Sequence, residues 1–229
     1  MSEKNRERMR GDCVDQAELR LRALFLPLSE EIDSEPSVSD HSSQRKAATL
    51  ILDLLRAQLP RTAAHSERVG AMSAAIGKRL GLSPAQQETL QLAGELHDIG
   101  KLFVPRQALS KEGELGSEEY AKVREHPRLG LRFLELFPIL EAARAGILYH
   151  HERFDGAGYP YQLQGREIPL VARIVSVADC YDAMTNDRAY RPAMSESAAV
   201  QELTASSGTQ LDPEVVEVAL ALIAERACA

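Results

Sequence analysis

The sequence predicts a helical bundle built around a metal centre. Apolar residues recur at helical spacings of three and four in several separate segments, and helix-start residues precede some of these segments. Potential metal ligands recur at intervals of roughly one helix plus a connection. This arrangement lets the facing helices of a bundle direct their ligands toward one interior point.

The first predicted helices follow from apolar spacing and from cap residues. An apolar stretch over residues 47–59 predicts a first helix that packs on the bundle. The next helix begins at Ser83-Pro84, with serine at the N-cap and proline at the first helical position, and its apolar face ends at His97. A further helix is predicted between these two, beginning near Thr62. Its apolar face consists of residues spaced by four, three, four and four positions: His65, Val69, Met72, Ile76 and Leu80.

The later segments repeat the pattern. Residues 117–119 are predicted to cap a helix that runs toward His126, where Pro127 disfavours helical dihedrals for the residue before it and so marks a helix end or break. The apolar faces of residues 139–152 and 168–184 lead to His150-His151 and to Asp179. Helices over residues 195–206 and 212–225 are predicted to be scaffold.

Seven residues are candidate metal ligands because of this regular placement. One histidine on an apolar face is more often a satisfied core residue than a ligand. A larger set changes that interpretation, because burying many ionisable groups without partners costs several kcal/mol each. A metal centre would satisfy all of them together. The candidates are His65, His97, Asp98, His126, His150, His151 and Asp179.

The donor types narrow the choice of metal. The ligands are nitrogen and oxygen donors, while Cys13, Cys180 and Cys228 lie outside the pattern, so the site suits iron, manganese, zinc or nickel. Seven ligands are too many for one tetrahedral ion, and we therefore expect two divalent ions. In two-metal hydrolytic sites a bridging water is acidified to hydroxide and attacks phosphorus in line. Asp98 is the candidate bridging carboxylate.

Several runs of the sequence resemble the HD-GYP domain, a subfamily of the HD-domain phosphohydrolases. These are HDIGK at 97–101, HHERFDGAGYP at 150–160 and DCYDAMT at 179–185. The runs EHPRLG at 125–130 and RAYR at 188–191 also match in order, and the resemblance covers residues 62–225. It implies an all-α, HD-domain-like fold with a buried non-haem iron or manganese centre that hydrolyses cyclic di-GMP to the linear dinucleotide and, in some members, to GMP.

The resemblance also implies roles for individual residues. The seven candidates would be the ligands, and Lys101 would hold a phosphate oxygen or protonate the leaving alkoxide. Tyr159 and Gly158 would contact the substrate from a glycine-rich loop. Arg188 and Arg191 would bind phosphate or guanine through their planar fork. The alternatives are plain packing for Tyr159 and a solvated basic surface for the two arginines.

Four further charged residues carry separate expectations. Members with a third metal have a glutamate four residues before the first histidine, where this chain has Arg61. A cation cannot replace that ligand, so we expect two metals and favour the linear dinucleotide as product. Glu152, Asp155 and Asp182 could orient ligand imidazoles. A structural salt bridge or cap is an equally good interpretation, and none of the three is assigned a catalytic role.

The composition argues against several other classes of protein. The 229 residues carry a net charge of −7, which argues against binding to duplex nucleic acid. No run of 18 apolar residues and no signal-peptide pattern occurs, so we expect a cytoplasmic protein without a membrane span. Residues 1–46 are predicted to be an N-terminal extension with a short helix and a flexible linker, and residues 47–229 the catalytic domain. Regulatory input would come through the extension or a signalling partner. A homodimer is the other assembly that we expect.

Two other functions stay open at this stage. The first is an HD-type hydrolase of a different nucleotide, such as another cyclic dinucleotide or a phosphomonoester. The second is a binding module for cyclic di-GMP without useful turnover. Missing ligands would indicate a binding module, and none of the seven is missing.

Overall fold

The computed structural model describes residues 41–111, 113–187 and 192–227, and within them the fold is entirely helical apart from one isolated bridge between Ser207 and Leu211. The all-α class predicted from the sequence is therefore confirmed. The α-helices are α2 (His41–Gln58), α3 (Pro60–Arg79), α4 (Pro84–Leu96), α5 (Arg106–Leu109), α6 (Ser117–Val123), α7 (His126–Leu134), α8 (Arg144–Tyr149), α9 (Leu170–Thr185), α10 (Glu196–Ser206) and α11 (Pro213–Ala227). Three 3-10 helices connect them, η1 (Ile99–Phe103), η2 (Pro138–Ala143) and η3 (Gly165–Glu167).

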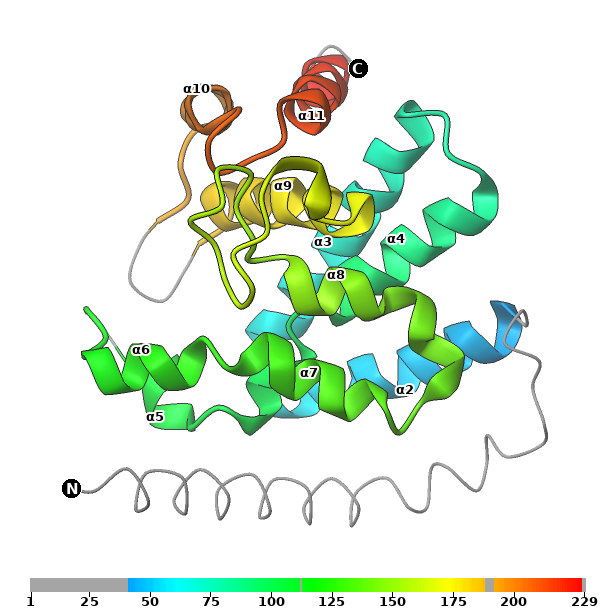
Figure 1. The fold of residues 1–229 in the computed structure, drawn as a ribbon, viewed down its shortest axis with the longest axis vertical. Helices are drawn as coiled ribbons and strands as arrows, with labels where there is room; N and C mark the ends of the chain where they lie inside the picture. The colour runs from blue at the N-terminus through cyan, green and yellow to red at the C-terminus, as the bar shows by residue number, and fades with distance from the viewer. Residues whose placement is uncertain (1–40, 112, 188–191, 228–229) are drawn as a thin grey trace.

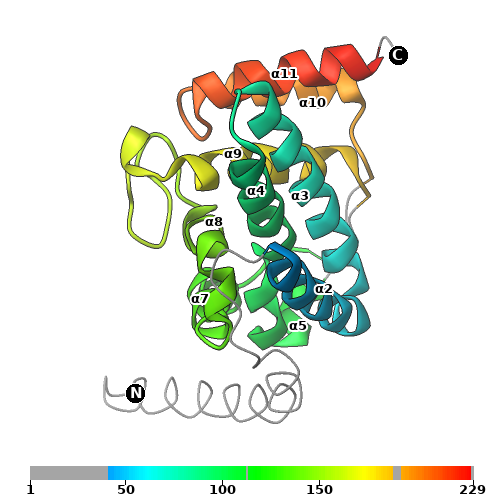
Figure 2. The same ribbon diagram turned by 90° about the vertical axis from the view of Figure 1, so that its right-hand side faces the viewer.

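Helices α3, α4 and α9 form the centre of the bundle and pack against one another. Helix α8 lies against α4 and α9, and α2 lies against α3 and α4. Helices α10 and α11 lie at one end of the molecule, while α2, α5 and α7 lie at the other (Figures 1 and 2). The core between them is aliphatic, with Ile76, Leu96, Ile147 and Val175 buried in a single cluster.

Helix α2 begins earlier than the sequence indicated. Residues 41–46, which the sequence analysis assigned to a flexible linker, form its first turns. Gln44 lies on the buried face, and the Arg45 guanidinium binds the carboxylates of Glu88 and Glu95 at 2.5 Å each. These contacts join residues more than forty positions apart, so the polar composition of the segment gave no sign of them. Residues 41–46 are therefore helical, and the division of the chain into two parts at residue 46 stays a prediction.

Helix starts follow local rules closely at α4 and less closely at α6. Ser83 and Gln86 form a reciprocal capping box, and Pro84 is the first residue of α4, as predicted. At α6 the cap residue is Gly116, whose N–H donates to the Glu119 carboxylate at 2.8 Å. Ser117 is the first helical residue rather than the cap. None of the described helices combines the length and the apolar character needed to cross a bilayer.

Candidate metal centre

The seven predicted ligands come from five parts of the chain and meet at the centre of the bundle. His65 lies in α3, and Asp179 lies in α9. The other five stand at helix ends: His97 caps α4, Asp98 precedes η1, His126 is the first residue of α7, and His150 and His151 follow α8. The break predicted at His126 is thus the junction of α6 and α7. Helix ends place these side chains where several elements converge.

Three of the imidazoles are oriented by the same kind of hydrogen bond to the backbone. Nδ1 of each ring lies within hydrogen-bonding distance of the backbone carbonyl three residues earlier, at 2.7 Å for His97 and Gly94, 2.7 Å for His126 and Val123, and 2.9 Å for His150 and Ile147. A carbonyl only accepts, so Nδ1 carries the proton and donates. The lone pair is left on Nε2, which can bind a metal ion.

His65 is oriented by a carboxylate instead. Its Nδ1 lies 2.7 Å from Oδ2 of Asp182, and Arg68 holds the same carboxylate at 2.6 and 2.9 Å. Asp182 is therefore the partner that fixes the His65 ring, which decides between the two interpretations that its sequence position left open. The signal available in the sequence was its spacing, because Asp179 and Asp182 are three residues apart in α9 and share a helix face.

The ligands divide into two groups, and Asp98 lies between them. In one group, donor atoms of His65, His97 and Asp98 all lie within 4.8 Å of one another, and in the other those of His126, His150 and His151 do. Oδ2 of Asp98 faces the first group, at 3.4 Å from His97 Nε2, and Oδ1 faces the second, at 3.3 Å from His126 Nε2. The carboxylate is thus placed as a bridge would be.

Asp179 and Lys101 complete the centre. Oδ1 of Asp179 lies 3.1 Å from Nε2 of His65 and adds an oxygen donor to the first group. The Lys101 ammonium lies 2.5 Å from Oδ2 of Asp98. Gly100 allows the segment that carries Asp98 and Lys101 to approach α7, because a Cβ there would lie 1.9 Å from the His126 carbonyl oxygen. Any side chain at this position would push the two ligand groups apart.

Burial and charge set the protonation states of the ligands. Burial lowers the pKa of His126 to about 3 and that of His151 to about 4, and it lowers the pKa of His150 as well. These rings are neutral at physiological pH, the form that binds metal. Burial alone would raise the pKa of Asp98, but the positive charge of Lys101 and the contact with His97 outweigh it and hold that pKa well below its ordinary value.

The residues fit divalent cations. Oδ1 of Asp98 is fully buried and makes no hydrogen bond within the described part of the chain, although a buried carboxylate oxygen normally has a partner. Nε2 of His126 faces it at 3.3 Å, and His150 Nε2 lies 3.2 Å from His126 Nε2. Cations between these atoms would satisfy all of them together. Nitrogen and carboxylate donors at this spacing suit first-row divalent metals.

The glycine-rich loop after α8 folds back over His151. The Tyr159 N–H donates to the His151 carbonyl at 3.2 Å, and the two rings stack with centroids 4.7 Å apart. Gly158 is buried, and a Cβ there would lie 2.3 Å from the Arg153 backbone nitrogen. What the structure establishes for Gly158 is therefore this close approach, and contact with substrate stays a prediction. Arg188 and Arg191 lie outside the described residues.

Glu152 stabilises the glycine-rich loop through hydrogen bonds to its backbone. Its buried carboxylate accepts hydrogen bonds from the N–H groups of Tyr161 and Leu163, at 2.6 and 3.1 Å. Asp155 has a similar local role and accepts from the Ala157 N–H while pairing with Arg153. Both residues thus act on the loop backbone, and neither contacts a ligand imidazole. The structural interpretation of these two acids is the correct one.

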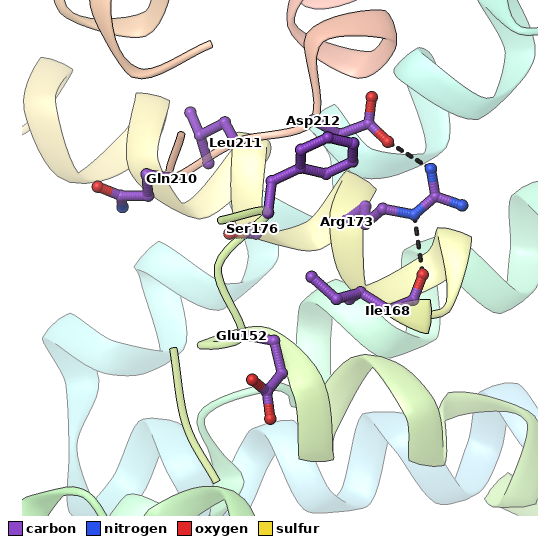
Figure 3. A pocket seen from close by; sticks show the side chains of 8 residues that line it. Glu152, Ile168, Arg173, Ser176, Gln210, Leu211 and Asp212 are labelled. Atoms are coloured by element: carbon purple, nitrogen blue, oxygen red, sulfur yellow. Dashed lines mark hydrogen bonds and ion pairs between the residues drawn. The ribbon is translucent and has the colours of Figure 1, made fainter. Parts of the chain in front are cut away.

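A small pocket lies behind the loop, between α9 and the segment that joins α10 to α11 (Figure 3). The Arg173 guanidinium donates to the Ile168 carbonyl and pairs with the buried Asp212, whereas the Glu152 carboxylate points away from this pair (Figure 3). Phe154 and Asp155 also donate backbone hydrogen bonds to Gln210 and Thr209. The pocket is thus part of the scaffold that supports the loop.

The fold and the site define a helical protein with two adjoining groups of histidine and aspartate side chains that could hold metal ions. The family model of the HD domain matches residues 49–215, and the chain belongs to this family. The resemblance found in the sequence is confirmed by this match and by the curated relatives, and solved structures share the fold. One of these, the HD-GYP-type protein Bd1817 of Bdellovibrio bacteriovorus, superposes with a TM-score of 0.60 over 86% of this chain and 67% of its own, at 18% identity.

Several curated relatives are similar to this chain. A cyclic di-GMP phosphodiesterase of Thermotoga maritima is 42% identical over 160 residues, which cover 69% of this chain and 44% of the relative. The cyclic di-GMP phosphodiesterase response regulator RpfG of Xanthomonas campestris is 32% identical over 93% of this chain and 55% of its own length. The 3'3'-cGAMP-specific phosphodiesterase 3 of Vibrio cholerae is 40% identical over 70% and 35%. The chain thus spans about half or less of each relative.

Proposed function

We propose that this chain is a metal-dependent phosphodiesterase that hydrolyses cyclic di-GMP to the linear dinucleotide, with further cleavage to GMP as a second possible step. The observation that carries the proposal is the position of Asp98, whose two carboxylate oxygens face two separate histidine groups. Relatives named as cyclic di-GMP phosphodiesterases support the substrate. We also propose, from the sequence, that the protein is cytoplasmic.

The metal part of the proposal is two divalent ions, iron or manganese, with zinc and nickel as alternatives. His65, His97, Asp98 and Asp179 would hold one ion, and Asp98, His126, His150 and His151 the other. When bound, such a pair supplies an acidified water as nucleophile and positive charge for the phosphate oxygens. The exposed Arg61 supports two ions rather than three, because a cation stands where a further carboxylate would be needed.

The side chains around the candidate ligands would protonate the leaving group and bind the substrate. Hydrolysis breaks one phosphorus–oxygen bond and leaves a ribose oxygen that must gain a proton. Lys101 would donate that proton or hold a phosphate oxygen, since its ammonium already lies at the Asp98 carboxylate. Burial raises the pKa of the Tyr159 hydroxyl, so this group stays protonated and would donate a hydrogen bond to the substrate. Arg188 and Arg191 remain predicted contacts for phosphate or guanine.

A second candidate function is hydrolysis of a mixed cyclic dinucleotide. Several relatives are named as 3'3'-cGAMP-specific phosphodiesterases, at 31 to 40% identity. The same metal centre would serve either substrate, because the reacting phosphodiester is common to both. The third reading, a binding module without turnover, gains no support from the site, because all seven ligands are present and converge. A signalling partner or a homodimer remains a prediction.

The test is a product assay on anaerobically purified protein loaded separately with Fe(II) and Mn(II). Cyclic di-GMP and 3'3'-cGAMP are incubated in parallel, and products are separated by chromatography. Linear dinucleotide or GMP from cyclic di-GMP is expected, and an Asp98→Ala control is expected to be inactive. Hydrolysis of 3'3'-cGAMP without hydrolysis of cyclic di-GMP would mean that the second candidate function is the correct one. Binding without product, at full metal occupancy, would contradict the enzyme reading.

A further inference from the structure

Tyr159 is enclosed on both faces of its ring, which changes where a nucleotide base could bind. The His151 ring stacks on Tyr159 at 4.7 Å with 21° between the planes, and the Arg124 guanidinium carbon lies 4.3 Å from the Tyr159 centroid. Two flat groups at these distances cannot share one face of a ring, so they occupy opposite faces. A base therefore has no free face of Tyr159 to stack on.

Arg124 is instead the outermost flat group of this stack. It follows the last residue of α6 and is exposed, and it makes no ion pair with a carboxylate within the described part of the chain. Its contact with Tyr159 lies well inside the range of cation–π interactions. Tyr120 flanks the guanidinium more loosely at 5.7 Å and is 50% exposed. Because Arg124 is exposed and has no carboxylate partner among the described residues, its guanidinium offers a platform for an aromatic ligand.

The order of the stack indicates which part of a nucleotide Arg124 would reach. His151 belongs to the metal centre, Tyr159 lies outside His151, and Arg124 lies outside Tyr159. A phosphate held at the centre would lie on the His151 side, so the guanidinium stands near the part of the ligand that points away from the reacting phosphate. In a cyclic dinucleotide that part is a purine base, and arginine planes stack well on bases.

We propose that Arg124, whose guanidinium lies over Tyr159, binds a purine base of the cyclic dinucleotide by stacking, with Tyr120 beside it. This inference rests on the proposed function and adds a substrate-binding residue on α6 to it. The alternative is that Arg124 only fastens the loop. Arg128 offers the matched comparison, because it lies over Tyr161 at 5.6 Å but pairs with Glu125, and Tyr161 contacts Tyr149 rather than a metal ligand.

The test compares wild type, Arg124→Ala, Arg124→Lys and Arg128→Ala at equal metal content. The kcat and KM are measured for cyclic di-GMP and for glycerophosphocholine, a phosphodiester without a base or any other aromatic group. For Arg124→Ala we expect KM for cyclic di-GMP to rise about ten-fold, and the kcat/KM ratio of cyclic di-GMP to the base-free ester to fall by about the same factor. Lysine should not restore KM, because it keeps the charge but lacks the plane.

Three results would overturn the inference. Equal changes in Arg124→Ala and Arg128→Ala would mean that both arginines only fasten the loop. Equal losses on both esters would mean damage to the centre, and full rescue by Arg124→Lys would mean that charge matters rather than stacking. A wild type that cleaves the base-free ester but no cyclic dinucleotide would instead refute the proposed function, and the inference with it.

Discussion

The Asp182 carboxylate lies 2.7 Å from Nδ1 of His65, although 117 positions separate the two residues in the sequence. This contact joins α3 to α9 and fixes the His65 ring, whose Nε2 lies 3.1 Å from Asp179. The carboxylate and its partner Arg68 form a small charged network at the edge of the metal centre. Asp182 is therefore placed to orient a candidate ligand.

Replacing Asp182 by alanine should weaken metal binding at the His65 group. Carboxylates that orient a ligand imidazole typically contribute about 10- to 100-fold in metal affinity. We expect a loss of that size for the ion at the His65 group, measured by metal titration with Mn(II), while the circular dichroism spectrum stays helical. The matched control is Asp155→Ala, which removes a carboxylate that contacts only the loop. Unchanged affinity in Asp182→Ala would contradict the assigned role.

Replacing His126 by alanine should remove one ion and leave the other. His126 belongs to the group with His150 and His151, whereas His65, His97 and Asp179 serve the other group. Elemental analysis of the purified variant should therefore give half of the wild-type metal content, and turnover should be lost. His41→Ala is the control, because His41 is exposed at the start of α2. Loss of all metal from His126→Ala would mean that the two groups bind as a single site.

Replacing Gly158 by alanine should destabilise the protein by altering the loop. The new Cβ would lie 2.3 Å from the Arg153 nitrogen and 2.6 Å from Glu152 Cα, both of them backbone atoms that cannot rotate away. Overpacking of this kind costs about 2 kcal/mol. Urea unfolding measures the loss, and Gly116→Ala serves as control because its Cβ meets only the Glu119 side chain, at 3.4 Å. Equal stability of the two variants would contradict the close approach.

Replacing Arg173 by methionine should be more costly than the same change at Arg166. Arg173 pairs with Asp212, whose side chain is 2% exposed, so the substitution leaves a buried carboxylate without its partner. Breaking a buried pair in this way costs about 3 kcal/mol or more. Arg166 pairs with Glu214 in solvent, with side chains 75% and 66% exposed, and its loss should cost less than about 1 kcal/mol. Chemical denaturation of both variants decides the comparison.

Periodicity and short motifs within single segments were enough to predict the helical class, the Ser83 cap, the break at His126 and the seven ligand candidates. The packing of the helices shows in addition that Asp98 faces two histidine groups, that Asp182 contacts His65 and that Arg124 lies over Tyr159. It also shows that residues 41–46 belong to α2. Each of these depends on contacts between residues far apart along the chain, and such contacts leave no local pattern in the sequence.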